Sequence, residues 1–377
     1  MNGFQFQPGF LLLEDGTLFH GAIHGAQRGT VAEVVFTTNM SGYQEVFTDP
    51  SYRGQVVVMT APMIGNYGIN DDDPESAGVQ VAGVVVRELS ATYSNWRATG
   101  DLASWLGRAN VPILSEVDTR RLTRHLRTAG VMRGVLGVGE EPDSAARAAL
   151  DACPSMEGLD LASQVTTREP YTWGPADARR HIVAYDFGIK RNILRLFESH
   201  DCRVTVVPAE TPASEVLAMH PDGVFLANGP GDPAAVTYAI RNVREIADSG
   251  TPIFGICLGH QILALAFGGQ TEKMPYGHRG GNHPVKVVAT GQVLITSQNH
   301  GFAVAGTEAG IPGAPSLEVT HVNLNDGSIE GLRHKELPIF AVQYHPEAAP
   351  GPHDARPLFN QFMDVVQARG ARKLTNS

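Results

Sequence analysis

The chain has 377 residues, and its hydrophobic content of 42% and charged content of 18% are ordinary for a soluble globular protein. Its 29 Lys and Arg are outnumbered by 39 Asp and Glu, and the net charge of −10 argues against a general binder of nucleic acid or anionic membranes. Its 3 scattered cysteines suit neither a disulfide framework nor a zinc site, and no Lys or Arg precedes Arg28, as a signal peptide would require. We therefore expect two domains and a reducing, cytoplasmic compartment.

The first part of the chain, residues 1–150, mixes β-rich and helical patterns, which predicts a smaller mixed α/β domain. The expected strands are 31–37, 55–60 and 79–87, and the expected helix is 119–128. The acidic triplet Asp71–Asp73 lies in a turn-rich segment, where a solvated turn is favoured over a metal-binding loop. An irregular stretch at 151–180 is the expected junction between domains.

From His181 onward, short apolar runs alternate with helical segments, which predicts a doubly wound, mostly parallel sheet over 181–377. The expected strands are 182–185, 203–207, 223–227, 253–256, 285–288, 293–296 and 339–343, with a closing helix at 357–368. The uncharged stretch 249–271 has the length of a membrane span, but its glycines and its proline favour a buried strand, turn and helix.

The strongest local signal is GICLG at 255–259, which places Cys257 between an apolar run and a helical one. In hydrolases the pattern G-x-nucleophile-x-G forms a sharp strand-to-helix turn that exposes the nucleophile. The helix N-terminus favours the thiolate, and its free N–H groups can hold an oxyanion. The pattern predicts that Cys257 is a nucleophile, although a lone cysteine is more often a buried core residue.

A base and a group that orients it are supplied by HPE, in which His345 and Glu347 follow an apolar strand. Side chains two residues apart in an extended segment leave on the same side, and Pro346 prevents a helix. We expect Glu347 to fix one tautomer of His345, which leaves the other ring nitrogen for the thiol. An ordinary exposed loop is the alternative if the pattern is taken by itself.

The segment NGPGDP at 228–233 admits two interpretations. One is a turn whose N–H groups face the reacting centre. The other is a dinucleotide fingerprint, because Gly229–Ala234 matches G-x-G-x-x-A with Asp248 downstream. Asp232 would repel a pyrophosphate and the two prolines remove N–H donors, so we favour the turn.

Other cofactor signals are weak. No G-x4-G-K-[ST] loop for ATP occurs in the sequence. His278 and His283 lack the neighbouring Cys or carboxylate cluster of a metal site. We therefore expect no metal and no cofactor in this chain.

Together, NGPGDP, GICLGHQ and HPE resemble the signature of the class I glutamine amidotransferases. The first half of the chain points to one member of this class. Its segments EDGTLFHG (14–21), GYQEVFTDPSY (42–52) and IGNYG (64–68) are similar to the N-terminal domain of the small subunit of carbamoyl phosphate synthetase. QNHGFAV (298–304) and HPEAAPGPHD (345–354) also match that subunit, so the resemblance covers nearly the whole chain.

The resemblance implies that Cys257, His345 and Glu347 form a triad that hydrolyses glutamine to glutamate and ammonia. It implies that the glutamine-binding positions are Ser51, Gly229, Gly231, Leu258, Gln261, Asn299, Gly301 and Phe302. Ammonia would pass through a tunnel to a large subunit. There ATP, with Mg, and bicarbonate would give carbamoyl phosphate for pyrimidine and arginine synthesis.

Several other functions remain open. The chain could be the amidotransferase subunit of another biosynthetic complex, although the long first domain argues against this. It could be a free-standing cysteine hydrolase of γ-glutamyl compounds, which would be active without a partner. An oxidoreductase built on Gly229–Ala234 and a non-catalytic scaffold are weaker alternatives.

Overall fold

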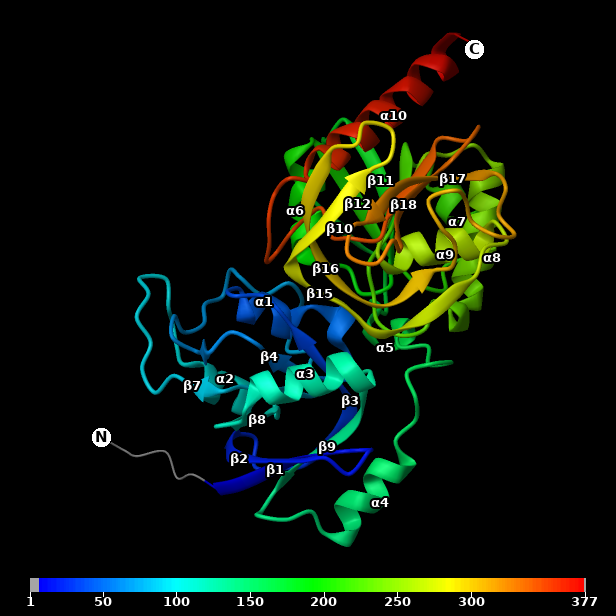
Figure 1. Cartoon of the computed structure of the whole chain (residues 1–377). Helices are drawn as coiled ribbons and strands as arrows, with labels where there is room; N and C mark the ends of the chain where they lie inside the picture. The colour runs from blue at the N-terminus through cyan, green and yellow to red at the C-terminus, as the bar shows by residue number, and fades with distance from the viewer. Residues whose placement is uncertain (1–6, 376–377) are drawn as a thin grey trace. The chain divides into compact units, whose positions relative to one another are not determined.

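The computed structural model describes residues 7–375, and the side chains of residues 7–369. The chain divides into two compact units (Figure 1). The first comprises the residues up to Met156 with Pro275–Arg279, and the second comprises Glu157–Met274 with the residues from Gly280 onward. The expected bounds 1–150 and 181–377 themselves stay a prediction. Among the described residues, every helix is too short or too polar to span a bilayer.

The first unit is built on a closed barrel, which the sequence patterns did not reveal. The strand order is β1 (Gln7–Leu13), β2 (Leu18–Gly25), β8 (Pro112–Ser115), β6 (Gly83–Val85), β4 (Gln55–Met59), β3 (Thr30–Thr37) and β9 (Met132–Val138). Pairs β3–β4, β4–β6 and β6–β8 are parallel, and the pairs β1–β2, β1–β9, β2–β8 and β3–β9 are antiparallel. The expected strands 31–37 and 55–60 correspond to β3 and β4, whereas the strand expected at 79–87 is confined to β6.

Alternate residues of the barrel strands pack in two apolar clusters. Val34 and Val56 belong to one cluster, together with Leu122 and Leu126 of α3 (Thr119–Ala129). The other cluster joins strand residues such as Val57 to α1 (Tyr43–Thr48) and α2 (Leu102–Arg108). The helix expected at 119–128 is therefore present as α3, and α4 (Ser144–Ala152) packs on β9.

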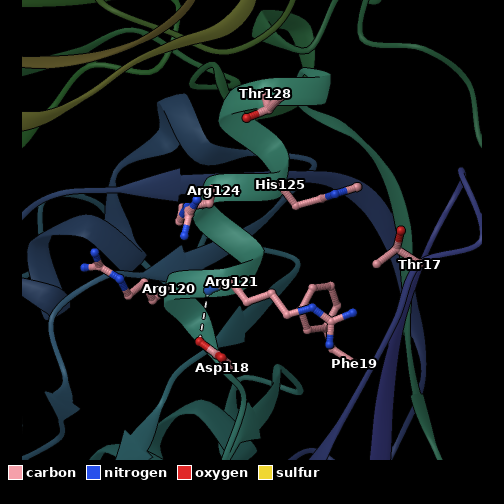
Figure 2. Close-up of a pocket in the computed structure, with 8 residues that line it drawn as sticks. All are labelled: Thr17, Phe19, Asp118, Arg120, Arg121, Arg124, His125 and Thr128. Atoms are coloured by element: carbon pink, nitrogen blue, oxygen red, sulfur yellow. Dashed lines mark hydrogen bonds between the residues drawn. The ribbon is translucent and has the colours of Figure 1, made fainter.

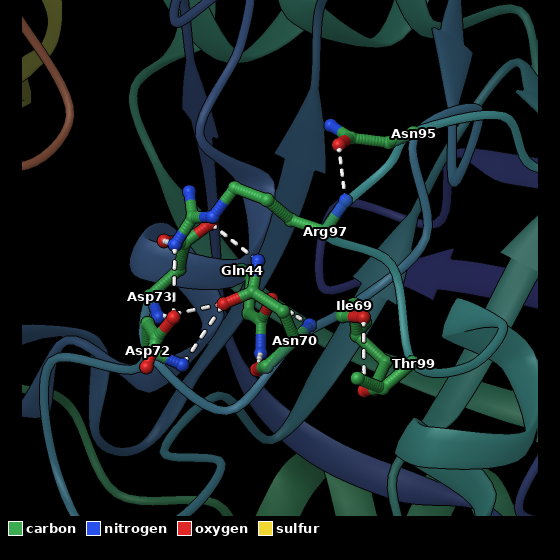
Figure 3. A network of polar contacts seen from close by, with 8 residues as sticks. All are labelled: Gln44, Ile69, Asn70, Asp72, Asp73, Asn95, Arg97 and Thr99. Atoms are coloured by element: carbon green, nitrogen blue, oxygen red, sulfur yellow. Dashed lines mark hydrogen bonds and ion pairs between the residues drawn. The ribbon is translucent and has the colours of Figure 1, made fainter.

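The segment between β4 and α2 has little regular structure and is held by polar contacts (Figure 3). β5 (Met63–Ile64) and β7 (Glu88–Leu89) pair within it. Arg97 binds Asp73 at 2.7 Å and Asp72 at 3.4 Å, and Nδ2 of Asn70 donates to Asp73 at 2.7 Å. The acidic triplet thus contributes to a turn in which arginine neutralises two carboxylates.

The second unit contains a mixed sheet. The strand order is β10 (Tyr171–Trp173), β12 (Cys202–Pro208), β11 (Arg180–Asp186), β13 (Gly223–Leu226), β14 (Ile253–Ile256), β19 (Ile339–Val342), β18 (Ile329–His334), β17 (Leu317–Asn323), β15 (Thr271–Val287) and β16 (Val293–Val304). Neighbours from β12 to β19 are parallel, which confirms the predicted doubly wound sheet at its centre. No strand was predicted at β17 or β18. The predicted strands 285–288 and 293–296 cover only one end of β15 and one end of β16.

Helices cover both faces of this sheet (Figure 1). One face carries α7 (Ala213–Ala218), α8 (Thr237–Asp248) and α9 (Leu258–Ala266), and the other carries α6 (Arg191–Ser199) and α10 (Pro357–Thr375). In β11, Val183 packs in the first layer and Ile182 in the second. Short elements in loops complete the fold, namely η1 (Pro50–Tyr52) in the first unit and α5 (Ala162–Val165) and η2 (Pro233–Ala235) in the second. In such sheets, sites form at the carboxyl ends of the parallel strands.

Candidate active site

Cys257 occupies the turn between β14 and α9, at the carboxyl end of a central parallel strand. Its φ of 54° and ψ of −102° cost a non-glycine residue about 1–3 kcal/mol, and such strain is typical of nucleophile turns. A Cβ added at Gly259 would lie 2.3 Å from the carbonyl oxygen of Leu226, so that position accepts only glycine. The chain thus forms the expected strand-turn-helix elbow.

His345 and Glu347 follow β19, the strand beside β14, and both side chains are buried. Nδ1 of His345 lies 2.7 Å from Oε1 of Glu347, and the His345 N–H donates to the carbonyl of Ser297 at 2.8 Å. Nε2 makes no conventional hydrogen bond within the described residues, but an interaction with the Cys257 thiol helps to raise the pKa of the ring. The structure therefore brings the three predicted triad residues together.

The charge state of this group follows from its surroundings. Burial lowers the pKa of His345, but the Glu347 carboxylate and the Cys257 thiol together outweigh burial and the nearby Lys190, so the net shift is upward. Burial raises the pKa of Glu347, but Lys190 and His345 outweigh it and the net shift is downward. Glu347 is therefore a carboxylate that holds a readily protonated imidazole.

Lys190 is a member of the site that the sequence analysis missed. Its side chain is buried, and Nζ lies 2.6 Å from Oε1 of Glu347 and 3.3 Å from the carbonyl oxygen of Ala349. Asn192 also holds the HPE segment in place, because its Nδ2 donates to the Glu347 carbonyl at 2.6 Å. In the sequence both residues read as the polar start of an amphipathic helix, and no local signal distinguishes them.

The loop that carries Lys190 is fixed by Asp186, the last residue of β11, and by Asn228, just after β13. Oδ1 of Asp186 accepts the N–H groups of Gly188 and Ile189 at 2.9 and 2.8 Å. Nδ2 of Asn228 donates to the Gly188 carbonyl at 2.9 Å. The ends of β11 and β13 therefore place Lys190 beside the HPE segment.

Two backbone N–H groups beside Cys257 are available for an oxyanion. The N–H groups of Leu258 and Gly229 have no acceptor among the described residues. The two residues are adjacent, since a Cβ added at Gly229 would lie 2.8 Å from Cδ2 of Leu258. The same Cβ would lie 2.2 Å from the Phe187 carbonyl oxygen, so this approach requires glycine. Such a pair of donors is the usual form of an oxyanion hole.

Four further predicted glutamine-binding residues lie in α9 and β16. Nε2 of Gln261 donates to the Phe302 carbonyl at 2.7 Å and to Oε1 of Gln343 at 2.9 Å, which leaves its own Oε1 for a ligand. Asn299, Gly301 and Phe302 lie in β16, and the Asn299 carbonyl oxygen is 3.6 Å from Sγ of Cys257.

The last two predicted binding residues are Gly231 and Ser51. Gly231 has a φ of 91° and lies in the turn after β13. Ser51 belongs to the first unit, where it is buried in η1 and its N–H donates to Oδ1 of Asp49 at 2.9 Å.

The turn at 228–233 does not have the features of a dinucleotide site. Oδ2 of Asp232 accepts the Gly158 N–H at 2.8 Å, and Oδ1 accepts the Ala234 N–H at 2.9 Å. The carboxylate therefore stabilises the turn and occupies an N–H group that a pyrophosphate would need.

Comparison with known proteins identifies both halves of the chain. Residues 183–365 match the glutamine amidotransferase class-I family, and residues 11–136 match the CPSase domain of the carbamoyl-phosphate synthase small chain. The carbamoyl phosphate synthase small chain of Thioalkalivibrio sulfidiphilus is 50% identical over 98% of this chain and 100% of its own length. Those of Chlorobaculum tepidum and Escherichia coli K12 are 52% and 50% identical over 96% and 95% of this chain, and over 98% and 97% of their own lengths.

Proposed function

Because this chain belongs to the carbamoyl phosphate synthase small-chain family, we propose that it hydrolyses glutamine and supplies the ammonia to a large, ATP-using subunit. The observation that carries the proposal is the unengaged N–H pair of Leu258 and Gly229 beside Cys257. The buried His345–Glu347 pair next to that elbow supports it.

In this proposal the Cys257 thiolate attacks the side-chain amide carbon of glutamine, and the carbonyl oxygen becomes an oxyanion held by Leu258 and Gly229. Protonated His345 gives its proton to the amide nitrogen, and the C–N bond breaks to release ammonia and a glutamyl thioester. His345 then takes a proton from water, whose oxygen attacks the thioester. The products are glutamate and the free thiolate.

Ammonia that escaped into water near neutral pH would mostly become ammonium and lose its nucleophilicity. We therefore propose that it passes through a tunnel to the large subunit. There ATP, with Mg, and bicarbonate would yield carbamoyl phosphate for pyrimidine and arginine synthesis. Ser51, Gly231, Gln261, Asn299, Gly301 and Phe302 are the other proposed glutamine contacts. We also propose a cytoplasmic location, in keeping with the free thiols of Cys153, Cys202 and Cys257.

The test is Cys257→Ser in the complex reconstituted with the large subunit. Glutamine-driven synthesis should collapse, whereas synthesis from added ammonia should survive. Equal loss of both activities in a folded variant would contradict the proposal. High glutaminase activity of the isolated wild-type chain, unaffected by the large subunit, would instead favour a free-standing hydrolase.

A further inference from the structure

Helix α3 of the first unit presents two different sides (Figure 2). On one side Arg121 lies over the Phe19 ring at 4.9 Å, and Nε2 of His125 lies 2.6 Å from Oδ2 of Asp15. Arg120 and Arg124 extend from the other side of the helix (Figure 2). The first side is thus engaged by its own unit.

The second side carries arginines without partners. Arg120, Arg124 and Arg127 are exposed, and with Arg87, which follows β6, they line a surface hollow of about 740 Å³. None of the four forms an ion pair or side-chain hydrogen bond with a described residue. The hollow also contains the buried, unpartnered hydroxyl of Thr123 and one carboxylate, that of Asp118, which caps α3 by accepting the Arg121 N–H. We call the four residues the arginine face.

Helix stability does not account for the arginine face as a whole. Arg120 lies in the first turn of α3, where the helix dipole disfavours a positive charge by about 0.3–1 kcal/mol, whereas Arg127 lies in the last turn, where the dipole favours one. Arg120 and Arg124 are four residues apart, and Arg124 and Arg127 three, so their charges repel one another. Leu122 and Leu126 already anchor the buried side of α3. Helix stability therefore gives no reason for Arg120 and Arg124 in a chain whose net charge is −10.

We propose that the arginine face is a docking surface for an acidic surface of the large subunit, an inference that rests on the partner named in the proposed function. Arginine is enriched at the centres of protein interfaces, because its planar guanidinium binds carboxylates through two hydrogen bonds. Opposite charges would also speed association of two large proteins.

The spacing of the charges favours a protein surface over a small anion. Arg120 and Arg127 are separated by seven residues, about 10 Å along the helix axis. A phosphate ion would meet only part of such a row, whereas carboxylates spread over a partner's surface can meet all of it. The overall negative charge of the chain also makes nucleic acid an unfavourable partner.

The experiment compares R120E/R124E with R147E in the full-length chain, each titrated with the large subunit. Arg147 is an exposed arginine of α4 in the same unit, so R147E controls for the reversal of one charge outside the arginine face. We expect the Kd of R120E/R124E to rise at least about tenfold and that of R147E to stay within about twofold. A wild-type Kd for R120E/R124E would overturn the inference.

A second measurement needs no variant. Phenylglyoxal modification of the wild-type chain, mapped by mass spectrometry, should show Arg87, Arg120, Arg124 and Arg127 protected in the complex and Arg147 still reactive. Protection by inorganic pyrophosphate or by an oligonucleotide, but not by the large subunit, would overturn the docking surface. If the wild-type chain failed to bind the large subunit at all, the proposed function itself would fall. Unchanged binding of R120E/R124E overturns the docking surface alone.

Discussion

Nζ of Lys190 lies 2.6 Å from Oε1 of Glu347, the same oxygen that lies 2.7 Å from Nδ1 of His345. One carboxylate oxygen is thus shared by a buried ammonium and a buried imidazole. Lys190 makes it easier for Glu347 to be ionised without water, and ionised Glu347 in turn keeps His345 charged. Lys190 also repels the imidazolium directly, which lowers the pKa of His345, so its favourable effect on the imidazole acts through the carboxylate.

Replacement of this lysine should be costly. Lys190→Met leaves a buried carboxylate without its cation, and we expect the free energy of unfolding to fall by about 3–5 kcal/mol. The matched control is Lys286→Met, because Lys286 pairs with Glu308 at 2.7 Å on the surface and such pairs contribute about 0–1 kcal/mol. Urea unfolding of the two variants measures the difference. Equal destabilisation of the two variants would show that the buried Lys190–Glu347 pair contributes no more to stability than a surface pair.

The acid stability of the protein should depend on Glu347. Because its pKa lies below the ordinary 4.5, its ionisation stabilises the fold above pH 4.5, and this contribution is lost as the pH falls toward the lowered value. His345 has a pKa above its ordinary 6.5, so its contribution is complete below pH 6.5 and is lost as the pH rises through the raised value. In Glu347→Gln the free energy of unfolding should vary less across both ranges. An unchanged pH dependence would contradict these assignments.

The same variant should alter the pH profile of glutaminase activity. Without the carboxylate the pKa of His345 falls, so the proton needed by the leaving nitrogen is lost at a lower pH. We expect the alkaline limb of kcat/KM to move to lower pH and kcat to fall by about 10²- to 10⁴-fold. Steady-state rates between pH 6 and pH 10 test this. An alkaline limb at the wild-type pH would show that Glu347 does not tune His345.

The oxyanion hole can be tested at Gly229. In Gly229→Ala the new Cβ would meet the Phe187 carbonyl oxygen at 2.2 Å, so the turn must shift and its N–H with it. We expect kcat for glutamine to fall by about 10²- to 10³-fold while synthesis from ammonia is retained. Gly78→Ala is the control, because a Cβ there meets nothing within 4 Å. A wild-type kcat in Gly229→Ala would exclude this N–H from the mechanism.

Gln261 couples α9 to β16 and to Gln343, the residue that follows β19. In Gln261→Glu a carboxylate would face the Phe302 carbonyl and Oε1 of Gln343, both of which are acceptors. We expect a loss of about 1–3 kcal/mol in the free energy of unfolding and a raised KM for glutamine. Gln361→Glu, at an exposed position of α10, controls for the added charge. Thermal unfolding and initial rates decide whether the two variants differ.

The sequence by itself predicted the centre of the second unit and the residues with the strongest local signals. Apolar runs revealed β11, β13 and β14, because a strand buried on both faces excludes polar side chains. Cys257 was identifiable because a thiol between two glycines after such a strand is a local pattern. His345 and Glu347 were identifiable for the same reason, as they are two residues apart.

Only the tertiary structure decided the contacts made across the sequence. Closure of the barrel depends on β1 pairing with β9, strands separated by more than a hundred residues, and no local pattern encodes that register. Lys190 reaches Glu347 across a similar separation, and a lysine before an amphipathic helix is ordinarily solvated. The reason is the same in both cases. Periodicity records which face of a segment is buried, whereas the partner found there is set by the packing of distant segments.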